Sequence, residues 1–187
     1  MSTSELIAKE VTALPESEQR PEMMASVMAS WAQISPNEAA TYAGQLPPAL
    51  QESAVRAVLQ AYAEQDPATG AKWLQAFTDD DLRGNAQSVF VSQWAQQDAV
   101  AVGEWLRSQP ESPSRQAAIE EFTRAVVSRE PASAWEWAGS VASEENRLTL
   151  QRQVMERWLR VDPGAALRAM EQVNWSEETK NEFRGGH

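Results

Sequence analysis

Apolar residues recur along this chain at helical spacing, in blocks that are alternately long and short. In residues 21–34 the apolar side chains are Met23, Met24, Val27, Met28 and Trp31. They fall on one helical face, because residues three or four apart are neighbours there. The same spacing predicts a first helix over 5–14, a short helix over 36–45 and long helices near 50–65, 82–97, 114–129 and 146–161. No stretch of alternating β-branched residues is long enough for a strand, so the pattern predicts an all-α fold.

The blocks are copies of one repeat. A polar residue followed by Pro or Ala starts each short helix, and the second residue of that pair stands at 36, 67, 99, 131 and 163, in steps of 31, 32, 32 and 32 residues. The short helices carry the series Tyr42, Trp73, Trp105, Trp137 and Ala169 at the same step. The long helices carry Trp31, Tyr62, Trp94, Val126 and Trp158. A third series, here called the arginine series, is Arg20, Gln51, Arg83, Arg115 and Arg147.

A fixed period in this range is typical of a helical solenoid. The clearest junction is Asp66-Pro67, where the carboxylate can cap the free N–H groups of a helix that Pro is suited to begin. We therefore expect a right-handed α-solenoid (superhelix) of antiparallel helical hairpins, with about ten or eleven helices. Residues 1–187 would form a single array: a half-repeat at 1–19, repeats near 20–50, 51–82, 83–114 and 115–146, and a terminal partial repeat at 147–187.

The junctions resemble those of a known family. Pro67 and Trp73 are six residues apart, and Pro131 and Trp137 keep this spacing. The pattern Asp-Pro-x-x-Ala-x-x-Trp resembles the tetratricopeptide (TPR) family. That family has a repeat of about 34 residues, whereas the repeat of this chain has 32. The family's Leu-Gly pair after Trp is missing, since Leu74 is followed by Gln75. The resemblance implies a TPR-like protein-interaction scaffold whose short helices line the concave side, and it transfers no ligand-binding residue.

Composition and charge narrow the functional classes. The chain has 27 acidic and 16 basic residues, a net charge of −11, which disfavours binding to a nucleic-acid backbone or an anionic membrane and permits a basic protein partner. It has no cysteine, and no apolar run approaches the roughly 20 residues of a membrane helix. We expect no cofactor and a cytoplasmic protein, unless the chain is a fragment that has lost a signal or an anchor.

Tryptophan is the most conspicuous residue type. Six of the eight Trp residues stand in the repeat series, so we expect them to pack between repeats; the alternative is a stacking platform for bases or sugars. Trp135 differs, because its register position holds Ala40, Ala71, Gly103 and Leu167 in the other copies. Trp135 and Trp137 cannot share a helical face, so one should be more exposed. We favour Trp135 as a surface anchor for a partner, and the alternative is a locally repacked core.

The charged residues have mainly structural interpretations. The arginine series lies near the N-terminal ends of the long helices, where the helix dipole disfavours cations. We expect each member to contact a neighbouring helix end, by a carbonyl or a salt bridge to a capping acid, with a phosphate-binding row as the alternative. Asp79-Asp80-Asp81 lacks the spacing of a calcium loop. The only histidine, His187, is the last residue, which excludes a His-based triad or metal site.

No feature indicates catalysis, so the prediction is a non-catalytic protein–protein interaction scaffold that binds a peptide or protein segment on its concave face. The alternative is a structural or assembly segment of a longer helical-repeat protein, since the chain begins and ends within a repeat. We expect a monomer or a weak end-to-end oligomer. The predicted binding residues are register positions with variable chemistry: Lys72, Gln75, Arg107, Trp135, Glu136 and Arg168.

Overall fold

The computed structural model describes residues 2–184, which form twelve α-helices joined by short connections and no strands. The all-α prediction is therefore confirmed. The helices are distributed over two compact units, Met1–Asp98 and Ala99–His187. His187, and with it the interpretation of that residue, lies outside the described residues.

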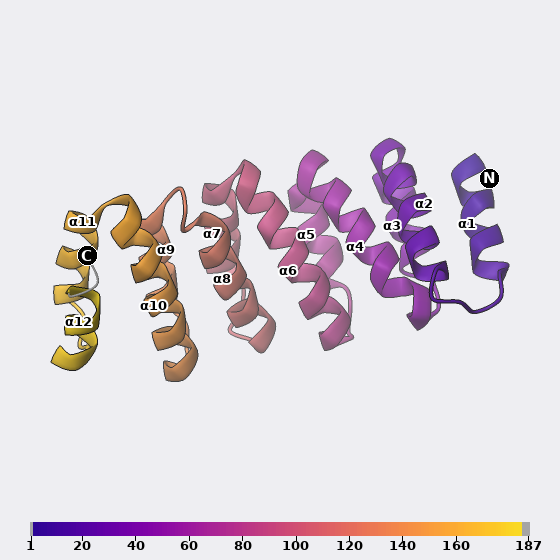
Figure 1. The fold of residues 1–187 in the computed structure, drawn as a ribbon. Coiled ribbons are helices and arrows are strands. Elements are labelled where there is room, and N and C mark those ends of the chain that lie inside the picture. The colour runs from indigo at the N-terminus through magenta and orange to yellow at the C-terminus, as the bar shows by residue number, and fades with distance from the viewer. Residues whose placement is uncertain (1, 185–187) are drawn as a thin grey trace. The chain divides into compact units, whose positions relative to one another are not determined.

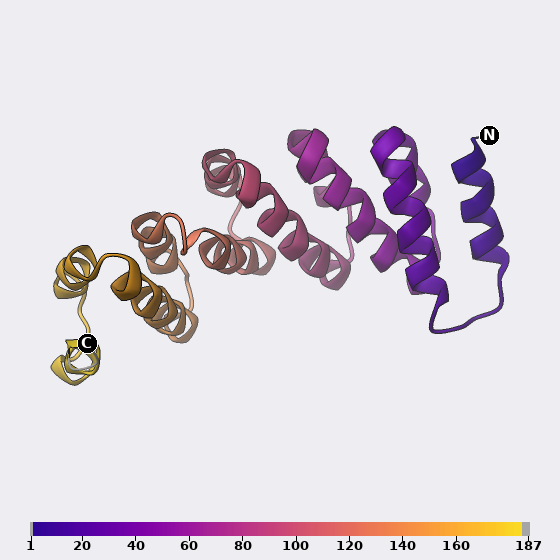
Figure 2. The same ribbon diagram turned by 45° about the horizontal axis from the view of Figure 1, so that its top comes forward.

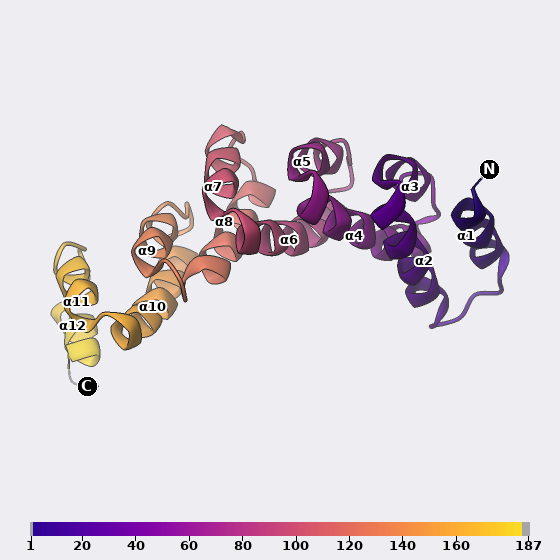
Figure 3. The same cartoon turned by 90° about the horizontal axis from the view of Figure 1, so that it is seen from above.

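The first unit contains six helices. They are α1 (Thr3–Ala13), α2 (Arg20–Ile34), α3 (Pro36–Ala43), α4 (Pro48–Gln65), α5 (Pro67–Gln75) and α6 (Asp80–Gln97) (Figure 1). The connection from Ala13 to Arg20 joins α1 to α2 and is seen well in Figure 2. The long helices α2, α4 and α6 pack in succession, and α3 and α5 form a second layer on one side of them (Figure 3).

The second unit contains the other six helices. They are α7 (Ala99–Ser108), α8 (Pro113–Val126), α9 (Pro131–Gly139), α10 (Glu144–Val161), α11 (Pro163–Glu171) and α12 (Glu177–Arg184). Within this unit, α7, α9 and α11 lie in one layer and α8 and α10 in another (Figure 3). The twelve helices of residues 2–184 are one more than the upper end of the predicted ten or eleven. The last of them begins after Ser176, which caps it by accepting from the backbone N–H of Thr179 at 3.2 Å.

The helix starts follow from the predicted local chemistry. Asp66 Oδ1 accepts from the backbone N–H of Thr69 at 3.1 Å, and Asp162 Oδ1 accepts from Ala165 at 2.9 Å. Each helix then begins with Pro, which lacks only an N–H that has no partner in the first turn. The helix predicted to reach 129 ends at Val126, because the N–H of Arg129 bonds the carbonyl of Val126 three residues back and tightens the chain into a turn.

Both units bury most of the apolar stripes that the spacing predicted, but Met23 of the predicted stripe on α2 is 43% exposed. The mainly aromatic series of the long helices, here called the aromatic series, is buried at all five positions: Trp31, Tyr62, Trp94, Val126 and Trp158. In the first unit Gly70 allows α5 to approach α4, because a Cβ at this position would lie 2.6 Å from Tyr62 Cβ. In the second unit a cluster of α10 and α11 residues includes Met155, Trp158 and Met170, and Trp175 joins it. Packing thus follows the repeat register.

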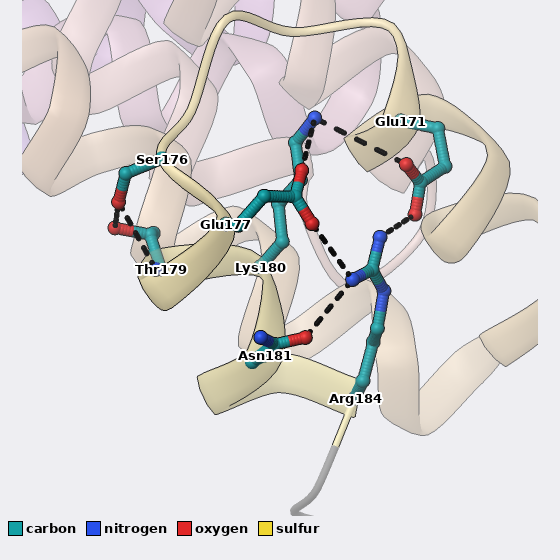
Figure 4. A network of polar contacts seen from close by, with 7 residues as sticks. All are labelled: Glu171, Ser176, Glu177, Thr179, Lys180, Asn181 and Arg184. Atoms are coloured by element: carbon teal, nitrogen blue, oxygen red, sulfur yellow. Dashed lines mark hydrogen bonds and ion pairs between the residues drawn. The ribbon is translucent and has the colours of Figure 1, made fainter.

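A polar network fastens α12 to α11 at the end of the second unit (Figure 4). Arg184 bonds the Glu171 carboxylate and also lies 3.2 Å from Glu177 Oε2. The Lys180 side chain is buried, with its Nζ 3.7 Å from Glu177 Oε1 and 4.0 Å from Glu171 Oε2. The Arg184 guanidinium holds the pKa of the Glu171 carboxyl below its usual value. The network also positions the connection between α11 and α12, which forms part of the third groove described below.

Candidate binding grooves between the short helices

The arginine series fixes the long helices to the ends of the preceding short helices. Each member donates to a backbone carbonyl there, and four of these bonds are Arg20 Nη2 to Thr12 O at 2.7 Å, Arg83 Nη1 to Phe77 O at 2.7 Å, Arg115 Nε to Leu106 O at 2.8 Å and Arg147 Nη1 to Val141 O at 2.9 Å. Gln51, which replaces arginine in the second copy, donates to Gly44 O at 3.0 Å. The expected carbonyl contact is therefore confirmed. A guanidinium that donates to a backbone carbonyl is poorly placed to bind a phosphate, which argues against the alternative of a phosphate-binding row.

The aromatic residues of the short helices pack against those of the long helices. The ring centroids of Tyr42 and Trp31 are 5.4 Å apart, and those of Trp73 and Tyr62 are 6.0 Å apart. In the second unit the Trp137 ring meets Phe122 edge-on at 5.4 Å. Tyr42 and Trp73 remain partly exposed, so each leaves part of its ring at the surface between short helices.

Grooves open beside the Tyr42 and Trp73 rings, and a third groove lies in the second unit. The first groove, of about 370 Å³, lies between α1 and α3 and is lined by Glu5, Trp31, Glu38, Thr41, Tyr42 and Gln45, with Ser2 at its edge. The second groove, of about 340 Å³, lies between the end of α3 and the end of α5 and is lined by Gly44, Gln51, Trp73, Phe77, Thr78 and Asp79, among others. Both belong to the first unit.

The third groove has a volume of about 560 Å³, more than either of the other two, and lies in the second unit. Its walls come from α9, through Trp135, Glu136 and Gly139, and from the connection between α11 and α12. The residues that α10 contributes are Glu144, Arg147, Leu148 and Gln151. Those of the α11–α12 connection are Val173, Asn174 and Trp175.

The second and third grooves occupy the same place in the repeat. Gly44, Gln51, Phe77 and Thr78 of the second groove correspond in register to Gly139, Arg147, Val173 and Asn174 of the third. At the register position of the two glycines the other copies carry Gln75, Arg107 and Glu171. The grooves therefore open where this position lacks a side chain.

The grooves are more acidic than basic. The first is lined by Glu5 and Glu38 and no base, and the second by Asp79 and no base. Lys9 bonds the Glu5 carboxylate and lowers its pKa. In the third groove, Glu136 and Glu144 outnumber a single base. This sign matches the net charge of −11 and favours a positively charged ligand.

The structure places the predicted binding residues on several helices. Lys72 and Gln75 are exposed on α5 in the first unit, and Arg168 is exposed on α11 in the second. The Arg107 guanidinium lies over the Trp137 ring, with its Cζ 4.9 Å from the ring centroid. Two of the six, Trp135 and Glu136, lie together along the third groove.

Trp135 is partly buried and Trp137 is buried, which confirms the predicted difference in exposure. The Trp135 ring packs against Trp175 in an edge-on geometry at 5.5 Å and against Trp158 at 6.3 Å. It is thus part of a packed aromatic cluster and at the same time lines the third groove. Its role as an anchor remains a prediction.

Sequence reasoning missed the glycines and the α11–α12 connection as parts of the grooves. The signal for the glycines was present, because Gly44 and Gly139 share a register position that holds larger side chains elsewhere. Trp175 carried no such signal, since it stands outside the aromatic series. Its place in the groove depends on how α12 packs.

Other kinds of site find little support in residues 2–184. This part of the chain contains no group of three or more His, Cys, Asp or Glu side chains arranged to hold a metal ion. None of its helices is long and apolar enough to cross a membrane. Comparison with known protein families, with curated proteins and with solved structures finds no match to this chain. The resemblance to the TPR family therefore remains a prediction.

Proposed function

We propose that this chain is a TPR-like, right-handed α-solenoid that works as a non-catalytic protein–protein interaction scaffold. It holds an extended peptide or protein segment of basic character on the concave face of its short helices. The observation that carries the proposal is the recurrence of one groove at equivalent register positions, in the second and third grooves. A ligand that runs across a repeat array meets such equivalent surfaces in succession.

The proposed contacts suit an extended segment. Each groove combines a partly exposed aromatic ring with polar side chains and at least one carboxylate. Aromatic rings supply large contact areas at low entropic cost, and the surrounding polar groups orient the ligand.

A selection from a display library of random peptides tests this function. Gly44→Gln together with Gly139→Gln fills two grooves, and neither glycine has a positive φ or an atom nearer than 3.6 Å to an added Cβ. Gly84→Gln is the matched control, because a Cβ there meets nothing within 4 Å and Gly84 lines none of the three grooves. Selected peptides should bind the control with the same affinity as the wild type. They should bind the filled variant at least about tenfold more weakly than the wild type.

Two results would contradict the proposal. Peptides that bind the filled variant as tightly as the wild type would place recognition outside the grooves. A library that yields no binding peptide at all would argue against peptide recognition by this chain.

One observation favours the alternative, a structural segment of a longer helical-repeat protein. Helix α1 exposes the apolar side chains of Leu6 and Ile7, by 45% and 43%, and contact with a neighbouring helix of an array would bury such side chains. Light scattering over a concentration series tests this function. Self-association that Leu6→Gln with Ile7→Gln abolishes would support it, and a monomer at every concentration would favour the peptide-binding scaffold.

A further inference from the structure

The third groove has an aromatic ring at a register position where the other repeats carry a small or aliphatic residue. Trp135 stands at a register position occupied elsewhere by Ala40, Ala71, Gly103 and Leu167. Its ring is held against Trp158 and Trp175 but is only partly buried, and it lines the groove. Because the ring is already ordered by packing, a ligand that covers it loses little further side-chain entropy on binding.

Two carboxylates of this groove are free to take a cation. Glu136 and Glu144 are both exposed, and neither has an ion-pair partner among residues 2–184. The nearby base does not neutralise them through a bridge. Arg147 instead donates to the carbonyl oxygens of Val141, at 2.9 Å, and Ala142, at 3.4 Å.

The remaining lining is apolar or small. Leu148 is 38% exposed, Val173 is partly buried, and Gly139 leaves the space open where other copies carry a side chain. A long side chain with an aliphatic stem and a positive end matches this combination. The stem can cover Leu148, the planar cation can stack on an indole face, and the charge can reach the two carboxylates.

We propose that the third groove binds an arginine side chain of an extended segment of the partner, with Trp135 as the stacking wall and Glu136 and Glu144 as charge partners. The proposal rests on the peptide-binding function and names the chemistry that this groove selects. Charge complementarity carries the assignment, since the groove has two carboxylates without ion-pair partners and lies in a chain of net charge −11.

Indole N–H resonances in a two-dimensional ¹H–¹⁵N spectrum give a readout for each tryptophan. The probes are three heptapeptides of alternating leucine and a second residue, which is arginine, its neutral isostere citrulline, or glutamate. Assignment uses Trp135→Phe and Trp175→Phe. We expect the Trp135 and Trp175 signals to shift on addition of the arginine peptide. The citrulline peptide should need at least about tenfold higher concentration for the same shift.

The test variants remove charge or space and leave the fold intact. Glu136→Gln with Glu144→Gln changes two exposed carboxylates and should weaken the arginine peptide about five- to tenfold, with a smaller dependence on salt. Gly139→Gln fills the groove and should abolish the shifts. Gly84→Gln is again the control and should leave them unchanged.

The outcomes separate this proposal from the general function. Equal binding of the arginine and citrulline peptides, or full affinity in the double Gln variant, would overturn the arginine assignment and leave peptide binding in place. Shifts confined to Trp31 and Trp73 would also overturn it, because those rings line the other two grooves. No shift with any probe, together with a display library that yields no peptide, would overturn both.

Discussion

The arginine series shows how a residue can be repeated at a place that its own helix disfavours. Each arginine lies near the positive end of the helix that carries it, but its guanidinium donates to a carbonyl group in the last turn of the preceding short helix or just beyond that turn. Carbonyl groups in the last turn of a helix have no partner within that helix. The side chain therefore satisfies one helix end and sets the position of the next helix in a single contact.

Substitution of Arg115 measures this contact. Its Nε lies 2.8 Å from Leu106 O, and its side chain is only 14% exposed. Arg115→Ala should lower the free energy of unfolding by about 1.5–3 kcal/mol, the usual range for a hydrogen bond from a charged donor. Arg115→Gln should lose less, because Gln51 makes the equivalent bond in another copy. Urea unfolding followed by tryptophan fluorescence gives these values.

Arg124→Ala is the control for this series. Its side chain is 49% exposed, and its ion pairs within residues 2–184 are with Glu120 and Glu121 of the same helix. The loss should stay below about 0.5 kcal/mol. If Arg115→Ala and Arg115→Met both unfold like the wild type, the structural role of the series is wrong.

Two glycines in the first unit should respond in opposite directions to the same substitution. A Cβ at Gly70 would lie 2.6 Å from Tyr62 Cβ and 3.0 Å from Phe90 Cε2, so Gly70→Ala should destabilise by about 1–3 kcal/mol through overpacking. A Cβ at Gly84 meets nothing within 4 Å inside α6, so Gly84→Ala should stabilise by about 0.5–1 kcal/mol. Thermal unfolding of both variants checks the signs, and a stabilised Gly70→Ala would contradict the close approach of α5.

At the scale of elements, α12 shows how a short helix is held in place. It has only eight residues, too few to be stable alone in water. Phe183 stacks on Trp175 at 5.6 Å, and the network around Glu171 adds polar contacts to the same docking surface (Figure 4). The position of α12 in turn sets the wall of the third groove.

Acid should loosen α12. The Glu171 pKa lies below its ordinary value of 4.5 in the folded chain, chiefly because Arg184 bonds the carboxylate. A lowered pKa contributes stability that is present above 4.5 and is lost as pH falls through the folded value. Amide hydrogen exchange, corrected for intrinsic rates, should show several-fold weaker protection of α12 amides as the pH falls below 4.5, with the apolar contacts retained.

Glu171→Gln should lower the protection of α12 at neutral pH and flatten its dependence on pH. Glu178→Gln changes an exposed carboxylate of the same helix and serves as the control. Equal pH dependence in the wild type and in Glu171→Gln would show that this carboxylate does not hold α12.

At the scale of the whole molecule, the described residues divide into two compact units, and the repeat runs through both. Val58 and Val154 occupy the same register position, one in each unit, and both are buried. In a repeat array each copy is stabilised mainly by its neighbours, so a local loss should remain local.

Val58→Ala and Val154→Ala form a matched pair that tests this property. Each substitution should remove about 2 kcal/mol from the packing around it. We expect Val58→Ala to increase hydrogen exchange in α4 and its neighbours and Val154→Ala to increase it in α10 and its neighbours. A uniform increase over all helices in both variants would instead indicate one cooperative unit.

The sequence by itself determined the helices and their register. Capping by Asp66, Pro at the first position and apolar spacing act within a single turn or two of chain, so local chemistry decides them. The partner of the arginine series could be predicted for the same reason, since a cation at an unfavourable helix end requires an acceptor nearby.

Only the tertiary structure decided where the surface opens. The grooves depend on residues far apart in the chain, such as Gly139 on α9 and Val173 after α11. The partial exposure of Trp135 depends on its contact with Trp175, and Arg107 is occupied by its contact with the Trp137 ring. The apolar spacing within one helix does not determine how side chains of neighbouring repeats fit together. A repeat period therefore predicts the arrangement of helices but not the shape of the surface between them.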